Sequence, residues 1–132
     1  MKNLIYCGLI ICFFSACLEK IDPNALTNTK WELIELPGST LPINAKATLN
    51  FADSLKLSGK SFCNGYGGQA KIADNKITLK NVFGTKMFCQ ETDEAERAYL
   101  SALNETNTAK IVDNKLYLLN GEQTLLVFSK IN

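Results

Sequence analysis

The sequence predicts a mostly β protein with one helix (α+β): a curved antiparallel sheet or partly open barrel of about eight short strands, with a single amphipathic helix packed against it. Three observations support this. Short runs of alternating apolar and polar residues begin near residue 29, turn-forming Asp-Asn and Asn-Gly pairs separate several of them, and residues 93–104 have helical spacing instead. Consecutive hairpins make neighbouring strands antiparallel, and curling the sheet buries one of its faces.

The first strands are expected between residues 30 and 58. Residues 30–36 alternate around a tryptophan and end at a Pro-Gly pair. Residues 47–51 and 55–58 alternate in the same way on either side of Ala-Asp-Ser, which predicts a hairpin.

Two later segments, 71–79 and 110–118, are near-copies of each other, KIADNKITL and KIVDNKLYL. In each, the central Asp-Asn pair can adopt the positive φ angles of a two-residue primed turn. We interpret them as reuse of one hairpin turn rather than as a true internal repeat. A further turn at Asn120-Gly121 leads into a last, mostly buried strand over 123–129.

The helix is expected over residues 93–104. Asp93 with Glu96 three residues later resembles a capping box. An apolar stripe at helical spacing is predicted to face the core; it consists of Ala95, Tyr99, Ala102 and Leu103. The acids at the start of the helix favour the positive end of its dipole, which is a structural role.

The N-terminus has the pattern of a signal peptide. Lys2 precedes an apolar run over residues 4–14, which as a helix would span about 16 Å, too short for a hydrocarbon core of about 30 Å. Phe14-Ser15-Ala16-Cys17 resembles a bacterial lipobox, although leucine is usual in place of Phe14. We therefore predict a lipoprotein signal peptide at 1–16; an ordinary secretory signal is the alternative.

Lipidation of Cys17 would make residues 17–28 a membrane tether and residues 29–131 the folded domain. Pro23 and its polar neighbours argue against regular structure in the tether. The expected location is the cell envelope, lipid-anchored, at the outer membrane facing the periplasm or the surface. We expect a monomer whose partners are the membrane, through the lipid on Cys17, and an envelope protein or a small apolar ligand.

Charge and cysteine content narrow the functions further. The chain has 14 basic and 13 acidic residues, and removal of Lys2 leaves 13 of each, so the net charge does not favour binding to nucleic acid.

Cys7 and Cys12 leave with the signal peptide, and Cys17 would carry the lipid, so Cys63 and Cys89 remain as an even pair in an oxidising compartment. A disulfide between them would close a loop of about 27 residues and stabilise by about 3–4 kcal/mol. Two cysteines without histidine do not make a zinc site, and no cofactor or metal is expected.

A glycine-rich segment follows Cys63. The spacing of its glycines matches neither the dinucleotide-binding nor the P-loop pattern. We interpret Gly67 and Gly68 as permitting a bulge or tight bend, with Asn64 hydrogen-bonding the bent backbone. Together with Tyr66 these residues form a candidate cluster, either structural or ligand-binding, and the structural interpretation is favoured.

Three segments taken in order resemble the META domain family, which includes the HslJ-like heat-shock lipoproteins. They are Trp31-Glu32-Leu33, the run from Leu57 to Gly68 with its Cys-Asn-x-Tyr-x-Gly motif, and the run from Val82 to Cys89 with Thr-x-Met-x-Cys. The helix with Glu96 and Leu103 follows. Phe62 and Phe88 depart from the family, which usually has glycine and alanine just before the two cysteines.

The resemblance implies a compact β-rich fold, an envelope location and an association with stress or drug tolerance, without a known reaction. The absence of histidine independently excludes Ser-His-Asp and Cys-His catalysis. We therefore expect no enzyme but a stress- or drug-tolerance-associated binding or interaction module. The alternative is a carrier of a small apolar ligand or lipid in a half-open barrel.

Overall fold

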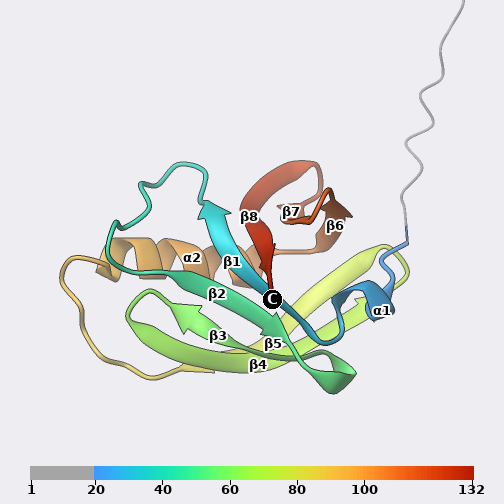
Figure 1. Cartoon of the computed structure of the whole chain (residues 1–132), viewed down its shortest axis with the longest axis horizontal. Coiled ribbons are helices and arrows are strands. Elements are labelled where there is room, and N and C mark those ends of the chain that lie inside the picture. Colours follow the sequence, from blue (N-terminus) through green and yellow to red (C-terminus); the bar gives the residue numbers. More distant parts are fainter. Residues whose placement is uncertain (1–19) are drawn as a thin grey trace, which may run out of the picture.

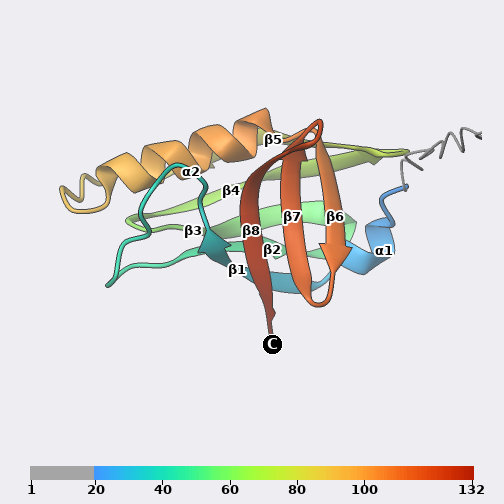
Figure 2. The ribbon, with the colours of Figure 1, turned by 90° about the horizontal axis from the view of Figure 1, so that it is seen from above.

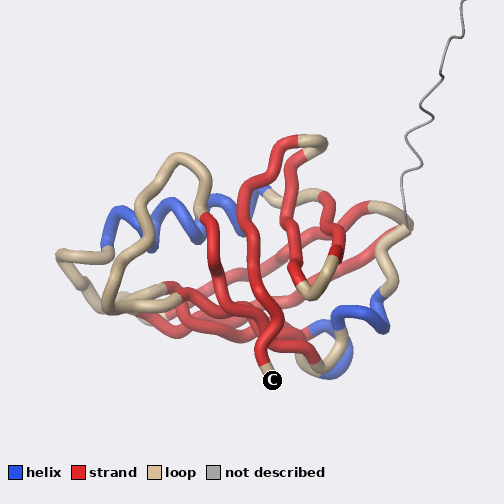
Figure 3. Tube along the Cα trace, turned by 45° about the horizontal axis from the view of Figure 1, so that its top comes forward, coloured by secondary structure: helices blue, strands red, loops and turns tan. Residues whose placement is uncertain are grey.

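A computed structural model describes residues 20–132, apart from the side chain of Asn81. Eight strands form one sheet, with helix α2 along one side (Figures 1 and 3). The strands are β1 (Thr29–Glu35), β2 (Ala47–Phe51), β3 (Lys56–Ser61), β4 (Asn64–Ala73), β5 (Lys76–Gly84), β6 (Thr108–Val112), β7 (Lys115–Asn120) and β8 (Gln123–Ile131). The helices are α1 (Pro23–Leu26), the short 3-10 helix η1 (Asp53–Leu55) and α2 (Asp93–Glu105).

The sheet is antiparallel throughout and nearly closes into a barrel. Its order is β5-β4-β3-β2-β1-β8-β7-β6, so the first and last strands of the chain are neighbours in its middle. The two edges meet at one point, where Ile77 N–H donates to Asn107 O at 3.0 Å and Thr108 Oγ1 donates to Asn75 O at 3.1 Å. Helix α2 packs against β5, β8 and β3 and covers the remaining opening (Figure 2).

The predicted fold class is confirmed, and its physical cause is visible in the strands. In β2 every second side chain, starting with the first, is buried and the two between them are half-buried. This period of two places one face of the curled sheet against the core. Trp31, Leu49, Phe51, Leu57 and Phe128 fill the interior, each at most 2% exposed.

The predicted hairpins are also confirmed. Asp113 and Asn114 have φ angles of 50° and 61°, as predicted for a primed turn, whereas in the first hairpin Asp74 has a φ of 55° and Asn75 does not have a positive φ. Short polar side chains tolerate this left-handed region better than others, which explains Asp74, Asp113 and Asn114 at these positions. Gly121, with a φ of 59°, makes the turn between β7 and β8.

Helix α2 begins at Asp93, as predicted, but its first turn differs from the expected capping box. Thr92 is the N-cap and makes no side-chain cap hydrogen bond. Asp93 instead pairs with Arg97 one turn later, at 3.0 Å. The apolar stripe faces the core as predicted, with Tyr99 and Leu103 fully buried.

The expectation of an irregular segment up to residue 28 was wrong for its second half. Pro23–Leu26 form the single turn of α1, with Asp22 as an N-cap whose side chain accepts from Asn24 N–H at 2.9 Å. Leu26 is 1% exposed, and Ile21 N–H donates to Asp74 O at 3.0 Å. Packed structure therefore starts about eight residues before the expected Thr29.

The predicted signal peptide (1–16), Cys17 and the first residues of the tether lie outside the described residues. Within residues 20–132, no helix has the length and hydropathy to span a bilayer.

Candidate functional site

The segment after β5 is fastened to the start of β4. A disulfide joins Cys63 and Cys89, whose Cα atoms are 5.9 Å apart. This is the predicted pairing, and the separation lies within the usual range for disulfides. At the other end of the segment, Thr85 N–H donates to Gly65 O at 3.1 Å.

Asn64 ties this segment to the barrel from inside. Its Oδ1 accepts from Met87 N–H at 2.8 Å and from Thr85 Oγ1 at 2.9 Å. Its Nδ2 donates to Met87 O at 3.0 Å and to Glu96 Oε1 at 2.7 Å. All four contacts connect groups far apart in the sequence, so the Asn64 side chain acts as a crosslink between β4, the segment after β5 and α2.

Glu96 completes the cluster from helix α2. Its Oε2 accepts from Ser61 Oγ at 2.8 Å and from Asn64 N–H at 2.9 Å. The residue is only 8% exposed, and neither of the two ion pairs found in residues 20–132 involves it. Hydrogen-bond donors therefore balance this buried carboxylate.

The pKa of Glu96 reflects two opposing effects. Burial would raise it, because a charged group loses hydration in the interior. The hydrogen bonds from Ser61 and from the main chain and side chain of Asn64 stabilise the ionised form, and together they hold the pKa below its ordinary value. The carboxylate is therefore charged at neutral pH and acts as a fixed acceptor.

Tyr66 belongs to a second hydrogen-bonded group deeper in the barrel. Its hydroxyl donates to Thr48 O at 2.7 Å and lies 2.7 Å from the Tyr99 hydroxyl, which is 3.2 Å from the same carbonyl. Burial raises the pKa of both phenols well above the ordinary value. Gly59 makes room for this arrangement, because a Cβ there would lie 2.1 Å from Thr48 O and 2.8 Å from the Tyr66 hydroxyl.

Gly67 and Gly68 of the candidate cluster lie at an irregularity in the backbone of β4. The β4–β5 register shifts between Gly67 and Gln69, which places the predicted bulge at Gly68. A Cβ at Gly68 would lie 2.9 Å from Lys80 O. At Gly67 it would lie 3.7 Å from the Phe83 ring, an ordinary contact.

Phe62 explains one of the departures from the family pattern. It has a φ of 72°, a region that glycine adopts freely and an aromatic residue adopts at a cost. Its ring is nevertheless 4% exposed and packs edge-on against Tyr99, with centroids 6.0 Å apart. Phe62 therefore has the left-handed backbone conformation in which glycine is usual, while its ring is buried.

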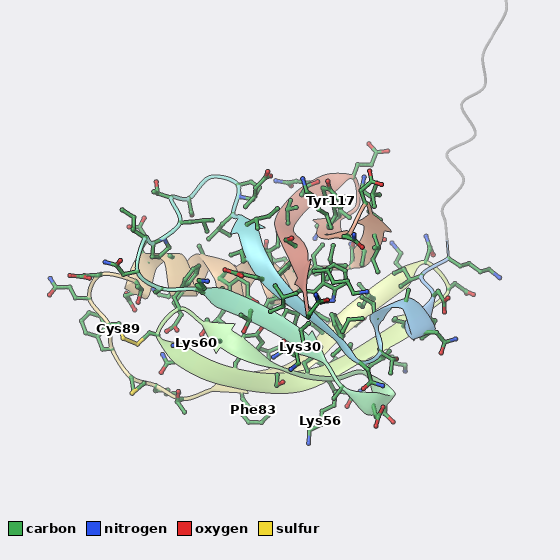
Figure 4. All side chains as sticks on the ribbon, viewed as in Figure 1. Lys30, Lys56, Lys60, Phe83, Cys89 and Tyr117 are labelled. Atoms are coloured by element: carbon green, nitrogen blue, oxygen red, sulfur yellow. A yellow bond between two sulfur atoms is a disulfide. The ribbon has the colours of Figure 1, made fainter. Side chains whose placement is uncertain are left out.

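Phe88, which precedes the other half-cystine, Cys89, does not join this aromatic group. It is 74% exposed. Two other large apolar side chains are also exposed: Met87 by 62% in the same segment, and Phe83 by 71% near the end of β5. We refer to Phe83, Met87 and Phe88 as the 83–88 surface; in Figure 4 Phe83 points away from the ribbon and Cys89 lies at one end of the molecule.

Two hollows with room for a small ligand lie at the surface of the described residues. A hollow of about 400 Å³ lies between the loop Gly38–Ile43 and the start of α2, and it opens to solvent. Another, of about 170 Å³, lies between α1 and β6. Large buried side chains occupy the interior of the barrel, where the carrier alternative would place its ligand.

The chemistry open to the Asn64–Glu96 cluster is therefore limited. Each buried side-chain polar atom in the described part of the chain has a hydrogen-bond partner. Residues 20–132 contain no group of three or more His, Cys, Asp or Glu side chains placed to hold a metal ion. The cluster holds backbone segments together, which supports the structural interpretation of Asn64 and Tyr66.

Sequence reasoning missed the role of Glu96. It was assigned to the helix dipole, yet it lies three residues before Tyr99 and seven before Leu103, on the buried side of the helix. A carboxylate within an apolar stripe was the available signal, because such a group must find donors in the core. Gly59 was missed too, since its close contacts involve a neighbouring strand.

The fold and this cluster define a class of protein: the chain belongs to the META domain family, whose family model matches residues 24–132. The heat shock protein HslJ of Escherichia coli (strain K12) is 28% identical over 79 residues, covering 58% of this chain and 56% of that protein. The match thus spans about half the length of this curated relative.

Two structures solved by NMR have the same fold. One, from Burkholderia xenovorans, is 26% identical, with a TM-score of 0.69, and the match covers 83% of this chain and 86% of that one. The other is 22% identical, with a TM-score of 0.66 and coverage of 83% and 94%, and this likeness concerns the fold alone.

Proposed function

We propose that this protein is a lipid-anchored component of the bacterial cell envelope whose META domain is a non-enzymatic binding module. The lipobox-like sequence ending at Cys17 supports the anchor. The internal use of the buried polar groups supports a role without catalysis. The printed name of the relative HslJ, a heat shock protein, supports an association with stress.

The observation that carries the binding role is the 83–88 surface. Exposed aromatic and methionine side chains are typical of protein interfaces. Phe83 lies on β5, and the segment after β5 that bears Met87 and Phe88 is held by the disulfide, by Thr85 and by both polar atoms of the Asn64 side chain. Such a segment binds with little loss of backbone freedom, because its conformation is already fixed. We therefore propose a protein partner in the envelope as the occupant.

Site-specific photocrosslinking in cells tests this role. A crosslinking amino acid at Phe83 is expected to capture one discrete partner, and Met87→Ser with Phe88→Ser should abolish the product without changing the melting temperature. The same probe at exposed Thr78, also on β5, is the matched control and should capture nothing. Equal products from both positions, or a product that survives the double substitution, would exclude the 83–88 surface as the binding site.

The anchor is tested separately. Mass spectrometry of the protein purified from membranes should find acyl chains on Cys17, and Cys17→Ala should move the protein to the aqueous phase on detergent partitioning. Acyl chains contribute about 0.8 kcal/mol per buried CH₂, so multiple chains hold a protein firmly. A mature protein without a lipid adduct would contradict this part of the proposal.

A further inference from the structure

The hollow between α1 and β6 borders the apolar interior of the barrel. Figure 2 shows β6 as the outermost strand of the sheet, with α1 beyond it. Ile111 of β6 pairs with Leu116 of β7, and directly opposite residues of an antiparallel pair lie on the same face of the sheet. Leu116 is fully buried and lines the hollow, yet Ile111 beside it is 39% exposed. An isoleucine on the inner face of the sheet is thus only partly covered.

The walls of the hollow suit an aliphatic side chain. Ala25 and Leu26 line it from α1, and Ala109, Ile111 and Leu116 line it from the β6–β7 hairpin. Its volume of about 170 Å³ is smaller than the roughly 300–1,000 Å³ of pockets that hold a drug-sized ligand. The hollow therefore has the size and the lining for one aliphatic side chain.

Two of the charged residues at the rim of the hollow have partners outside it. The Asp22 carboxylate accepts from Asn24 N–H as the cap of α1. The Lys110 ammonium lies 5.1 Å from the centroid of the Tyr117 ring. Both ion pairs found in residues 20–132 lie elsewhere. An uncharged side chain can therefore enter the hollow without breaking an ion pair in this part of the chain.

The chain itself has such a side chain within reach. Lys20 lines the hollow and is preceded by residues 17–19, which lie outside the described part of the chain. Two residue steps of extended chain span about 7 Å, so the side chain of Leu18 can reach the hollow from Lys20. The start of this span is fixed, because Ile21 N–H donates to Asp74 O.

We propose that Leu18 packs into the hollow between α1 and β6 and covers Ile111. This seating rests on the proposed cleavage before Cys17, because cleavage leaves Leu18 in a short segment without the apolar run of the signal peptide. A side chain joined to the domain by so few residues is present at a high effective concentration, so one apolar contact is enough to seat it.

The seating fixes the point at which the lipid leaves the domain. Cys17 is adjacent to Leu18, so its Cα lies about 3.8 Å from that of the seated residue. Cys89, next to Phe88, lies at the opposite end of the molecule from α1 (Figures 1 and 4). The anchor is thereby held at one end of the barrel, and Phe88 is kept at the other.

Photocrosslinking within the full-length protein tests the seating. A short aliphatic diazirine amino acid replaces Leu18 in the chain expressed in bacterial cells, and the irradiated protein is digested with trypsin and mapped by mass spectrometry. We expect an intramolecular link to the tryptic peptide 111–115, which begins with Ile111. The same amino acid in place of Glu19 is the matched control and should give about tenfold less of this link, because neighbouring side chains of an extended chain point to opposite sides.

Two variants of β6 show whether the link depends on the hollow. Ile111→Ser should lower the yield about tenfold, the factor that partial burial of one aliphatic side chain contributes to such an equilibrium. Val112→Ser should leave the yield unchanged, because Val112 pairs with Lys115 and does not line the hollow. Circular dichroism checks that both variants are folded.

The seating is overturned by equal links from positions 18 and 19, by a link that survives Ile111→Ser, or by a link from position 18 to a second copy or another protein. The mass of the purified protein reports the cleavage separately. A chain that keeps residues 1–16 would contradict the proposed anchor, and the link from position 18 is then measured on a chain that begins at Cys17. The two proposals can therefore fail independently.

Discussion

Replacing Glu96 with glutamine is the most direct test of the cluster that holds the Cys63–Cys89 region. Glu96 accepts three hydrogen bonds, and two of the donors belong to Asn64. A glutamine has one acceptor oxygen, so its amide group must face either the Asn64 N–H or the Asn64 Nδ2. Asn64 cannot turn its amide over, because its Oδ1 already accepts from Thr85 Oγ1 and Met87 N–H. One buried donor is left without an acceptor.

The expected loss follows from these contacts. A buried donor without a partner costs about 1–3 kcal/mol, and loss of the charge weakens the remaining bonds. Glu96→Gln should therefore reduce the free energy of unfolding by about 2–4 kcal/mol at pH 7. For a domain of this size that corresponds to a fall in melting temperature of about 8–16 °C.

The pH dependence gives a second readout with a definite sign. The pKa of Glu96 is lowered in the folded state from an ordinary value of 4.5. Its contribution is therefore fully present above about pH 5 and is lost as the pH falls through the lower, folded-state pKa. The stability difference between wild type and Glu96→Gln should shrink between pH 5 and pH 3, as followed by urea unfolding.

Glu94→Gln is the matched control, because it removes an exposed carboxylate from the same helical turn. It should change the stability by less than about 0.5 kcal/mol. The reasoning is refuted if Glu96→Gln is equally neutral, or if its deficit grows as the solution is acidified.

Three further changes test other parts of the structure. Phe62→Ala should reduce the free energy of unfolding by about 3–5 kcal/mol through loss of the buried ring. Phe62→Gly should be about 1 kcal/mol less destabilising than Phe62→Ala, because glycine adopts a φ of 72° without strain. Calorimetry of both variants measures this order, and a more stable alanine variant would show that the backbone at residue 62 is not strained. Tyr66→Phe should lower stability by about 1–2 kcal/mol, since Thr48 O retains only the longer contact to Tyr99; denaturant titration that finds no loss would show the hydroxyl to be dispensable. Cys63→Ser with Cys89→Ser should cost about 2–5 kcal/mol, and thiol titration of the wild type should find no reactive thiol in the described domain; a free thiol there would contradict the disulfide.

The parts of the fold that could be predicted from the sequence are local. The Asp-Asn hairpins and the helix at 93–104 depend on neighbouring residues, so their patterns are legible without a structure. Asp22-Pro23 was also a local signal for a helix start, because proline suits the first helical position and aspartate the cap. It was read as a break in structure, since a single turn followed by Thr27 lacks helical periodicity.

The parts that could not be predicted depend on pairing across the barrel. Glu96 meets Ser61 and Asn64, and these residues are 35 and 32 positions away in the sequence. Nothing in a one-dimensional pattern shows which donors a buried carboxylate will find. The exposure of Phe88 is a similar case, because the direction of its side chain depends on how the segment is fastened at Asn64 and Cys63.

The pairing of β1 with β8 has a consequence for how the protein is made. β1 lies between β2 and β8, and the register runs from Lys30 with Ile131 to Glu35 with Val127. The middle of the sheet thus joins the two ends of the domain, and contacts of such high sequence separation form late and slowly. During synthesis the sheet lacks its central β1–β8 pairing until the last ten residues, which contain β8, have left the ribosome. A truncation just before β8 would therefore remove one of the two strands at the middle of the sheet, whereas loss of β5 or β6 would remove only an edge strand.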